Sequence, residues 1–584
     1  MRRTKIVCTL GPASSSVEVL KELINSGLDV ARFNFSHGSH DEHAQRISNA
    51  RAAARELGKE IGILLDTQGP EIRTGAMAQG EATLKEGDTF VLRTADGEGD
   101  AQSVSVSYAG LARDVYPGAV ILIDDGLIGL KVERADQDRI FCTVTSGGVL
   151  GSRKGVNVPG ISINLPAVTA KDIADIEFGI EQEVDFIAAS FVRKAADVLE
   201  IRKLLEDRGA GDIQIIAKIE SQEGVTNIDE ILQVADGVMV ARGDLGVEIP
   251  TEEVPLVQKM LITKCNNCGK PVITATQMLD SMIRNPRPTR AEASDVANAI
   301  FDGSDAIMLS GETANGKHPV DAVKTMARIA ERSEQALNFE EKMRNRSSCL
   351  QRTTPDAISH ATSTIAWDLG AAAIITATKS GSTARMVSMY RPQAPIIAVT
   401  PERSALRKLK LVWGVNPVLI DETKGTDDLV AEAVAKALAA GQIKSGDLVV
   451  ITAGVPVGVP GSTNLIKVQV VGEIAARGIG IGSRIASGPV KMVATGEEAV
   501  ARIEQGDILV TTSTEREFVP AMEKAAGVVT EVGGLTSHAA IVCLNLGIPV
   551  IVGAADATSL LTEGETVTLD GRRGLVYRGI VRVL

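Results

Sequence analysis

The sequence predicts an α/β protein organised around a (β/α)8 TIM barrel, and three observations lead to this prediction. Short apolar segments rich in β-branched residues alternate with helical segments from residue 5 to about residue 337, with one long interruption. The apolar segments are hydrophobic on both faces, which is typical of parallel strands covered by helices. Polar residues follow them at their carboxyl ends, the edge where a TIM barrel places its active site.

The strands of the predicted barrel are apolar runs that end in glycine or polar residues. Eight such runs occur, at residues 5–10, 29–35, 62–67, 185–192, 213–217, 238–241, 271–276 and 306–309. Helical spacing of apolar residues predicts helices over residues 171–182, 195–207, 224–235 and 320–337. An earlier helix has its cap among residues 14–16 and ends at Gly27. This order of elements assigns residues 1–70 and 167–339 to the barrel.

The interruption, residues 71–166, has a different pattern. Short alternating strands broken by Gly and Asp run through it, for example around residues 104–107, 120–126 and 141–144. This pattern is typical of a small β domain. Because the strand and helix alternation resumes afterwards, we expect a small β-barrel domain inserted into the larger barrel.

Two further domains are predicted beyond the barrel. A polar stretch at residues 340–352 indicates a linker, and strands starting at Ala373, Ile396 and Leu448 with helices between them indicate an open, doubly wound α/β domain over 353–473. From Ile474 the chain becomes glycine-rich and then mixes short strands with helices. We expect a fourth, β/α domain over 474–584.

Composition excludes several classes of partner. The chain has 61 Lys and Arg against 74 Asp and Glu, a formal charge of −13, which argues against nucleic acid as the main partner. No apolar run approaches the roughly 20 residues of a transmembrane helix. The six cysteines have no framework spacing, which suits a reducing compartment. We therefore expect a cytoplasmic protein without membrane or nucleic-acid partners.

Charged residues converge at the ends of two neighbouring predicted strands. Lys218 and Glu220 alternate to the same side of the strand that begins at residue 213, and Asp244 follows the next parallel strand. An exposed ion pair of little energetic value is the alternative interpretation. The apolar flanks favour a functional site, since charge occurs only where the strands end.

A hydroxyl-rich loop opens a helix in the predicted α/β domain. Its residues are Thr378, Lys379, Ser380, Gly381, Ser382 and Thr383. Hydroxyls and backbone N–H groups at a helix N-terminus can hold a phosphate. A simple N-cap with additional serines explains the same residues, and the sequence alone leaves both interpretations open.

Seven segments of this chain resemble the pyruvate kinase family, in its long Bacillus-type form with an extra C-terminal domain. They are residues 4–14, 31–38, 65–74, 218–220, 239–246, 276–282 and 308–313. The resemblance covers the whole chain, with one departure: Gln68 stands where the family usually has Lys. This substitution puts in doubt any nucleotide contact made by that lysine.

The resemblance implies transfer of a phosphoryl group from phosphoenolpyruvate to ADP, the last step of glycolysis, in a homotetramer regulated by a phosphorylated effector. It implies Mg²⁺ (or Mn²⁺) and K⁺ as cofactors. The implied catalytic residues are Lys218, Arg32 and Thr276, with Gly243 and Asp244 joining them in substrate binding. The implied nucleotide-binding residues are Arg73, Lys154, Asn34 and His37. The implied metal ligands are Glu220 and Asp244 for Mg²⁺, and Asn34, Ser36, Asp66 and Thr67 for K⁺. The loop from Thr378 to Thr383 would hold the effector.

Two other functions fit parts of the sequence. A metal-dependent lyase acting on a pyruvate enolate would also use Glu and Asp on a barrel, but it has no use for Arg73 and Lys154. A catalytically inactive sensor could bind sugar phosphates through the loop at 378–383. The intact set of Lys218, Glu220 and Asp244 argues against a sensor.

One histidine in the fourth domain suggests a separate activity. Residues 533–542, around His538, resemble the phosphohistidine segment of phosphoenolpyruvate-utilising dikinases and sugar-transport phosphotransferases. Gly533 and Gly534 before Thr536 and Ser537 also fit a tight turn that caps a buried helix over residues 539–546. We favour this structural role, because the chemistry proposed above needs no phosphate carrier.

Overall fold

The computed structural model describes residues 2–161, 163–347, 353–423, 425–455 and 463–581. The chain forms two compact units. The first contains Met1–Cys349, Ser388–Arg391 and Glu402–Pro417, and the second contains Leu350–Val387, Pro392–Pro401 and Val418–Leu584. Each unit is described by itself.

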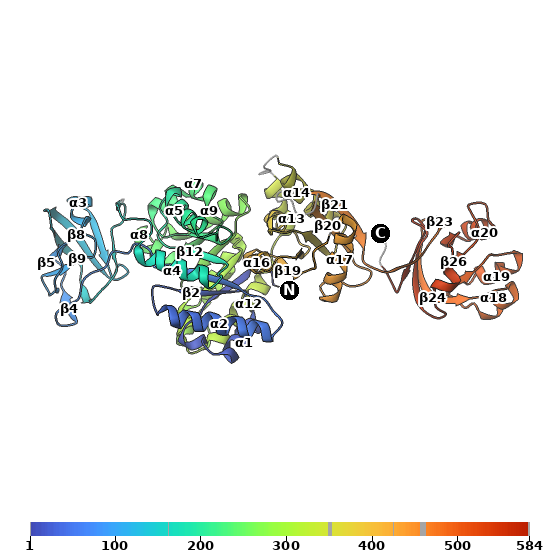
Figure 1. Ribbon diagram of the computed structural model, residues 1–584, viewed down its shortest axis with the longest axis horizontal. Helices are drawn as coiled ribbons and strands as arrows, with labels where there is room; N and C mark the ends of the chain where they lie inside the picture. The colour runs from blue at the N-terminus through green and yellow to red at the C-terminus, as the bar shows by residue number, and fades with distance from the viewer. Residues whose placement is uncertain (1, 162, 348–352, 424, 456–462, 582–584) are drawn as a thin grey trace. The chain divides into compact units, whose positions relative to one another are not determined.

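The first unit contains the predicted TIM barrel (Figure 1). Eight parallel strands close in the order β1-β16-β15-β14-β13-β12-β3-β2, and pairing of Lys5 with Ala306 joins the first strand to the last. The strands are β1 (Lys5–Thr9), β2 (Val30–Asn34), β3 (Gly62–Asp66), β12 (Phe186–Ala189), β13 (Gln214–Ile219), β14 (Gly237–Ala241), β15 (Val272–Ala275) and β16 (Ala306–Leu309). The predicted fold class is confirmed.

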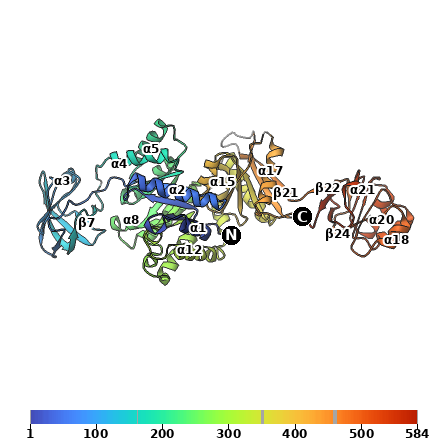
Figure 2. The ribbon, with the colours of Figure 1, turned by 60° about the horizontal axis from the view of Figure 1, so that its bottom comes forward.

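Helices cover the outside of this barrel. They include α1 (Val17–Ser26), α2 (His40–Glu56), α4 (Ala170–Glu181), α5 (Ala195–Asp207), α9 (Val254–Asn267), α10 (Arg290–Asp302) and α12 (Pro319–Glu334). Figure 2 shows α1, α2 and α12 side by side on one flank. Both faces of the strands are mainly apolar because one face fills the barrel interior and the other packs against these helices.

Two sequence-based predictions, one of a single helix and one of a linker, were wrong. The predicted helix over 224–235 is two helices, α6 (Gln222–Thr226) and α7 (Ile228–Val234). Asn227 separates them and donates a hydrogen bond from Nδ2 to the carbonyl of Arg193 at 2.9 Å. The described part of the predicted linker is helix α13 (Phe339–Ser347), since its Glu, Lys and Arg residues are good helix formers despite their polarity. Residues 348–352 of that linker lie outside the described residues.

The insertion forms a β domain with its own hydrophobic core. Its strands pair as a two-stranded sheet, β10-β4, and a six-stranded sheet, β11-β7-β8-β9-β5-β6. They are β4 (Glu81–Leu84), β5 (Thr89–Arg93), β6 (Ser103–Ser105), β7 (Val120–Ile123), β8 (Ile128–Ala135), β9 (Arg139–Ser146), β10 (Gly148–Gly151) and β11 (Val156–Asn157). The last strand leads back to the barrel.

The second unit contains two sheets. A five-stranded sheet has the order β19-β18-β17-β20-β21, with β19 at Val415–Leu419. Strands β17 (Ala373–Ala377), β18 (Ile396–Thr400) and β20 (Leu448–Gly454) are parallel. Strand β21 (Thr463–Val470) pairs antiparallel with β20. The glycine-rich C-terminal region forms an eight-stranded sheet in the order β22-β29-β28-β24-β25-β26-β27-β23, with helices α18 (Gly496–Arg502) and α20 (His538–Leu546). The strands are β22 (Ile474–Arg477), β23 (Ile479–Ile481), β24 (Ile485–Met492), β25 (Ile508–Thr511), β26 (Gly527–Thr530), β27 (Val550–Val552), β28 (Thr566–Asp570) and β29 (Leu575–Arg578).

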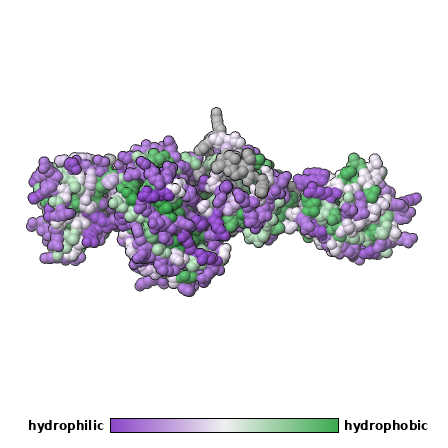
Figure 3. Space-filling model, in the orientation of Figure 1, coloured by the Kyte–Doolittle hydropathy of each residue, from purple (hydrophilic) through white to green (hydrophobic). Residues whose placement is uncertain are grey.

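Helix α20 begins one residue before the predicted start, but the expectation that it is buried was wrong. Ala539, Ala540 and Cys543 face the core, whereas Ile541 and Leu544 remain 53% and 63% exposed. The sequence could not show this, because the helix is apolar all round and only one face has a partner. Hydrophobic residues reach the surface of this region in Figure 3.

None of the helices in the described part of the chain combines the length and apolar character that crossing a membrane requires.

Candidate active site

The charged residues at the ends of β13 and β14 converge as predicted. Lys218 belongs to β13, Glu220 follows that strand directly, and Asp244 lies in the short helix α8 (Arg242–Glu248) that follows β14. Strand β14 pairs with β13 in parallel, with Lys218 opposite Met239. Lys218 Nζ lies 3.0 Å from Glu220 Oε1.

Lys218 is held by partners from three strands. Its Nζ donates to Asp66 Oδ1 at 3.1 Å and to Ser190 Oγ at 2.6 Å, in addition to its ion pair with Glu220. Burial lowers the pKa of Lys218, but the carboxylates of Asp66 and Glu220 outweigh burial and raise it above its usual value. The ammonium group therefore stays charged, although Lys218 is only 9% exposed.

Asp66 connects Lys218 to Arg32. Arg32 Nε donates to Asp66 Oδ2 at 2.7 Å, and its Nη1 donates to Thr9 Oγ1 at 2.8 Å. Burial alone would raise the pKa of Asp66, but Arg32 and Lys218 outweigh it and hold the pKa below its usual value. The ionised Asp66 thus orients two cations toward one end of the barrel.

Glu220 and Asp244 form a pair of carboxyl groups with raised pKa values. Burial is the main cause for both, and for Glu220 it raises the pKa to about 7, with Asp244 adding to the shift and Lys218 opposing it. Glu220 Oε2 also accepts a hydrogen bond from the backbone N–H of Phe191 at 2.6 Å. Two carboxyl groups that cost energy to ionise together suit a divalent cation, which would supply the missing positive charge.

This pair fits the coordination habits of Mg²⁺, which usually takes one or two carboxylates and completes its octahedron with water and substrate oxygens. No group of three or more His, Cys, Asp or Glu side chains is arranged to hold a metal ion anywhere in the described ranges.

Thr276 lies directly after β15 in a left-handed conformation, with φ of 64°. Its hydroxyl donates to the carbonyl of Ala275 at 2.7 Å and accepts from the N–H of Gly243 at 2.8 Å. The N–H of Gly243, a residue that the family resemblance assigns to substrate binding, is thus engaged within the protein. A non-glycine residue with positive φ is uncommon and marks local strain of the kind found at functional sites.

The predicted residues of the K⁺ site lie on neighbouring strands. Asn34 ends β2 opposite Asp66 at the end of β3. Asn34 Oδ1 accepts from the N–H of Ser36 at 3.2 Å, and the Thr67 hydroxyl accepts from the N–H of Ser190 at 3.2 Å. His37, expected to contact nucleotide, is exposed, and its carbonyl binds His43 Nε2 at 2.8 Å.

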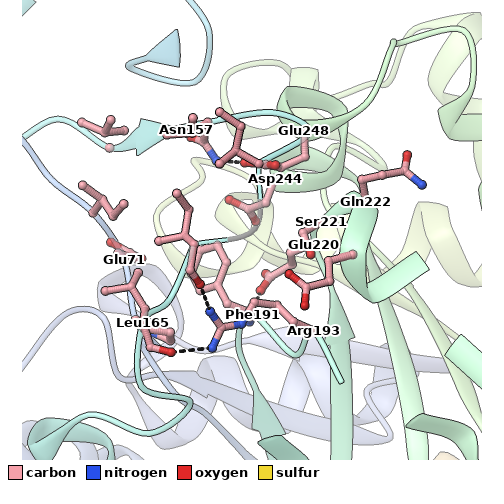
Figure 4. A pocket seen from close by; sticks show the side chains of 18 of the residues that line it. Glu71, Asn157, Leu165, Phe191, Arg193, Glu220, Ser221, Gln222, Asp244 and Glu248 are labelled. Carbon is pink, nitrogen blue, oxygen red and sulfur yellow. Dashed lines mark hydrogen bonds between the residues drawn. The ribbon is translucent and has the colours of Figure 1, made fainter. Parts of the chain in front are cut away.

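A cavity of about 560 Å³ opens beside Glu220 and Asp244 (Figure 4). Residues from the inserted domain line its other side, including Arg73 and Lys154. Arg73 Nε donates to Glu71 Oε2 at 2.6 Å, and Lys154 Nζ donates to Asp124 Oδ1 at 3.0 Å. The cavity has the size of a small-molecule site, and the carboxyl pair and the two cations share it.

Several residues of the site were not singled out from the sequence. Ser190 could have been found by the rule that identified Glu220, because it follows β12 at the same edge of the barrel. Phe191, with φ of 56°, and the cavity residues Asp124, Asn157, Arg193 and Glu248 gave no local signal. Their places depend on how the inserted domain meets the barrel.

The predicted effector loop lies in the second unit. Helix α15 (Ser382–Met389) begins in it. The N–H of Gly381 donates to Thr378 Oγ1 at 2.9 Å, and the hydroxyls of Thr383 and Thr463 lie 2.8 Å apart. Lys379 and Ser380 are exposed. The loop therefore presents exposed polar side chains beside the N-terminus of a helix.

Comparison with known proteins supports one family throughout. Residues 1–323 match the pyruvate kinase barrel domain, residues 356–469 the pyruvate kinase alpha/beta domain, and residues 503–574 the mobile domain of PEP-utilising enzymes. Pyruvate kinases of Geobacillus stearothermophilus and Bacillus licheniformis are each 58% identical to this chain, with all of both chains covered.

A solved structure supports the same family over most of the chain. The crystal structure of a pyruvate kinase from Cryptosporidium parvum is 42% identical and superposes with a TM-score of 0.77. The match covers 80% of this chain and 96% of that one. Together with the family models, which match more than half of the sequence, these relatives show that the chain belongs to the pyruvate kinase family.

Proposed function

We propose that this site transfers the phosphoryl group of phosphoenolpyruvate to ADP and then protonates the enolate to give pyruvate, with the residues assigned below. The pyruvate kinase activity itself follows from family membership. The observation that carries the assignment is Lys218, kept charged between Asp66 and Glu220 beside the carboxyl pair. Charge held in place before reaction costs little reorganisation when negative charge develops.

Lys218 and Arg32 are assigned to the phosphoryl group. The Lys218 ammonium can neutralise charge on the transferring phosphoryl and on the enolate oxygen. Arg32, oriented by Asp66 and Thr9, can bind the phosphate of phosphoenolpyruvate through its guanidinium group. Thr276 is assigned to proton delivery to the enolate, and its contact with Gly243 fixes the position of its hydroxyl.

The cation sites are assigned to oxygen ligands of this chain. Glu220 and Asp244 would hold Mg²⁺ or Mn²⁺, which when bound supplies Lewis-acid charge at the phosphoryl and enolate oxygens. Asn34, Ser36, Asp66 and Thr67 would hold K⁺. Arg73 and Lys154 are assigned to the nucleotide phosphates, where movement of the inserted domain would bring them. His37 remains a proposed nucleotide contact, whereas Gln68 supplies no cation to the nucleotide side.

A coupled assay for ADP-dependent pyruvate formation, with Mg²⁺ and K⁺ varied independently at constant ionic strength, tests these assignments together. We expect no turnover without ADP or without a divalent cation, and a marked loss without K⁺. Pyruvate formation that continues without ADP would favour the lyase alternative. Activity that does not depend on K⁺ would contradict the proposed ligand set at the ends of β2 and β3.

We also propose that the loop from Thr378 to Thr383 binds a phosphorylated small-molecule effector. The helix N-terminus at Ser382 and the exposed Lys379 and Ser380 support this proposal. In Ser382→Glu, a carboxylate would occupy the place of the phosphate, so activation by phosphorylated effectors should disappear while basal kcat is kept. Activity measured with and without a panel of phosphorylated sugars and nucleotides checks this prediction.

Ser382→Gln is the matched control for that variant, since it has nearly the same size without the charge. It should retain at least part of the activation. Full activation of the Glu variant would place the effector site elsewhere in the chain.

His538→Ala should leave kcat within about twofold of the unsubstituted enzyme, because direct transfer at the barrel needs no phosphate carrier. In the structure His538 opens α20 and its Nδ1 lies 3.0 Å from Thr514 Oγ1, a contact that fits a structural role. Steady-state kinetics and a test for acid-labile phosphate on His538 after incubation with phosphoenolpyruvate check this prediction. Finding such a phosphoryl group would make the C-terminal domain a working carrier.

The remaining assignments concern organisation. We propose four domains, with the barrel at 1–70 and 167–339, the inserted domain at 71–166, the α/β domain at 353–473 and the C-terminal domain at 474–584. We further propose a homotetramer located in the cytoplasm. Sedimentation of the purified protein tests the tetramer directly.

A further inference from the structure

The inserted domain is joined to the barrel by two crossings of the chain, and the second crossing is held by one side chain. Arg193 Nη1 donates to the carbonyl of Ile163 at 2.6 Å, and Nη2 donates to the carbonyl of Leu165 at 2.8 Å (Figure 4). The two carbonyls belong to the segment that returns from the insertion. One planar guanidinium group therefore fixes that segment at two points.

Arg193 is itself fixed to the barrel. It lies between β12 and α5. Its backbone N–H donates to Asp197 Oδ2 at 2.9 Å, and its backbone carbonyl accepts from Asn227 Nδ2 at 2.9 Å. Its side chain is 14% exposed. Ordering a side chain that is already packed costs little further entropy, so Arg193 acts as a rigid support at the rim of the barrel.

A second contact lies closer to the inserted sheet. Asn157 Nδ2 donates to Glu248 Oε1 at 2.8 Å, as Figure 4 also shows. Asn157 belongs to β11 and pairs with Leu122 of β7, so it must move with the inserted sheet. Glu248 belongs to α8 of the barrel. Any rotation of the inserted domain relative to α8 therefore changes this contact. The segment bound by Arg193 also touches the inserted domain, because Ile163 and Leu165 pack against its hydrophobic core and the N–H of Asn164 donates to Asp114 Oδ2 at 3.4 Å.

Residues 158–161, which lie between these two contacts, include one position suited to bending. Gly160 has φ of 75°, and a Cβ at this position would meet no atom within 4 Å. A glycine in open space can change its backbone angles without steric cost. Hinges commonly consist of a few such residues at the end of an element.

We infer that Arg193 is a positioning residue for phosphoryl transfer to the nucleotide. By binding the carbonyls of Ile163 and Leu165, whose side chains pack against the core of the inserted domain, it ties that domain to the rim of the barrel, so that the domain holds Arg73 and Lys154 at one defined place over the barrel site. This inference rests on the proposed function, in which those two cations contact the nucleotide phosphates. Arg193 itself need not touch substrate.

Steady-state kinetics of the full-length enzyme tests the inference through the two substrates. In Arg193→Ala the KM for ADP should rise about tenfold, because apparent affinity falls with the fraction of molecules in the competent arrangement. The KM for phosphoenolpyruvate should stay within about twofold, since its proposed ligands lie on the barrel. Arg193→Lys keeps the charge but loses the fork, and should raise the KM for ADP by a smaller factor. If Arg193→Ala does not fold, Arg193→Lys still tests the inference through the same two KM values.

Arg202→Ala is the matched control. Arg202 lies on α5, donates from Nη1 to the carbonyls of Gly211 and Ile213 at 3.0 and 2.9 Å, and pairs with Asp236. Its removal should lower Tm without changing the KM for ADP. If the KM for ADP rises equally in Arg193→Ala and Arg202→Ala, the effect of Arg193→Ala is general destabilisation and the inference is wrong.

Two other results would overturn the inference. An unchanged KM for ADP in Arg193→Ala would show that the anchor is not needed. Equal rises in both KM values would place Arg193 in the barrel site. Arg73→Ala separates this inference from the proposed function. If Arg73→Ala raises the KM for ADP and Arg193→Ala does not, only the positioning role of Arg193 fails. If Arg73→Ala has no effect, the proposed nucleotide side fails.

Discussion

Replacing Lys218 by Met is expected to lower kcat by about a thousandfold or more, while the Kd for phosphoenolpyruvate changes by less than about tenfold. Met has a similar length and no charge, so it removes the ammonium group that would meet developing negative charge. An interaction made mainly in the transition state lowers kcat rather than ground-state binding. The coupled assay gives kcat, and calorimetry in the presence of Mg²⁺ gives the Kd.

Lys5 provides the control for this variant. It is another buried lysine of the barrel, in β1, with Nζ donating to the carbonyl of Val415 at 2.7 Å. Burial lowers the pKa of Lys5 to about 8, although Asp29 opposes that shift, whereas the carboxylates around Lys218 raise its pKa. Lys5→Met should keep kcat within about threefold at pH 7 if a lysine outside the site has no catalytic role. Retention of most of kcat in Lys218→Met would remove Lys218 from the mechanism.

A stability measurement must accompany the Lys218 variant. Removing Lys218 leaves Asp66 and Glu220 buried without one of their cations, and breaking a buried ion pair costs roughly 3–5 kcal/mol. Arg32 still pairs with Asp66, so part of the network remains. Thermal unfolding shows whether the variant is folded at the assay temperature. If its Tm lies well above that temperature, the loss of kcat reflects lost catalysis and not partial unfolding.

The barrel could be predicted because its strands are buried on both faces and its charges are confined to their ends. The strand over Ala306–Leu309 was placed without error, and the convergence of Lys218, Glu220 and Asp244 followed from parallel pairing alone. The pairing of Lys218 with Asp66 could not be predicted. These residues lie 152 positions apart, and their contact depends on closure of the barrel across β12.

The side of the cavity formed by the insertion was the least predictable part of the site. Arg73 and Lys154 were assigned to the site only through the family resemblance. Nothing in the local sequence predicts their ion pairs with Glu71 and Asp124. The two hydrogen bonds from Arg193 to backbone carbonyls are still harder to predict from the sequence, because any residue can supply a carbonyl. Side chains that recognise backbone leave no pattern at the recognised positions.

Glu220→Gln is expected to raise the Mg²⁺ concentration for half-maximal activity by roughly a hundredfold, because it removes one of the two carboxylates proposed as ligands. The amide oxygen of Gln can still accept the N–H of Phe191, so the local backbone should be kept. The second readout is independent of turnover: Mg²⁺ with phosphoenolpyruvate should raise the Tm of the unsubstituted enzyme and raise that of the variant much less at the same concentration. Glu248→Gln is the matched control, since Glu248 lines the same cavity, has a pKa raised by burial, and keeps an acceptor for Asn157 after substitution. An unshifted Mg²⁺ titration in Glu220→Gln, or an equal shift in Glu248→Gln, would move the metal away from the ends of β13 and β14.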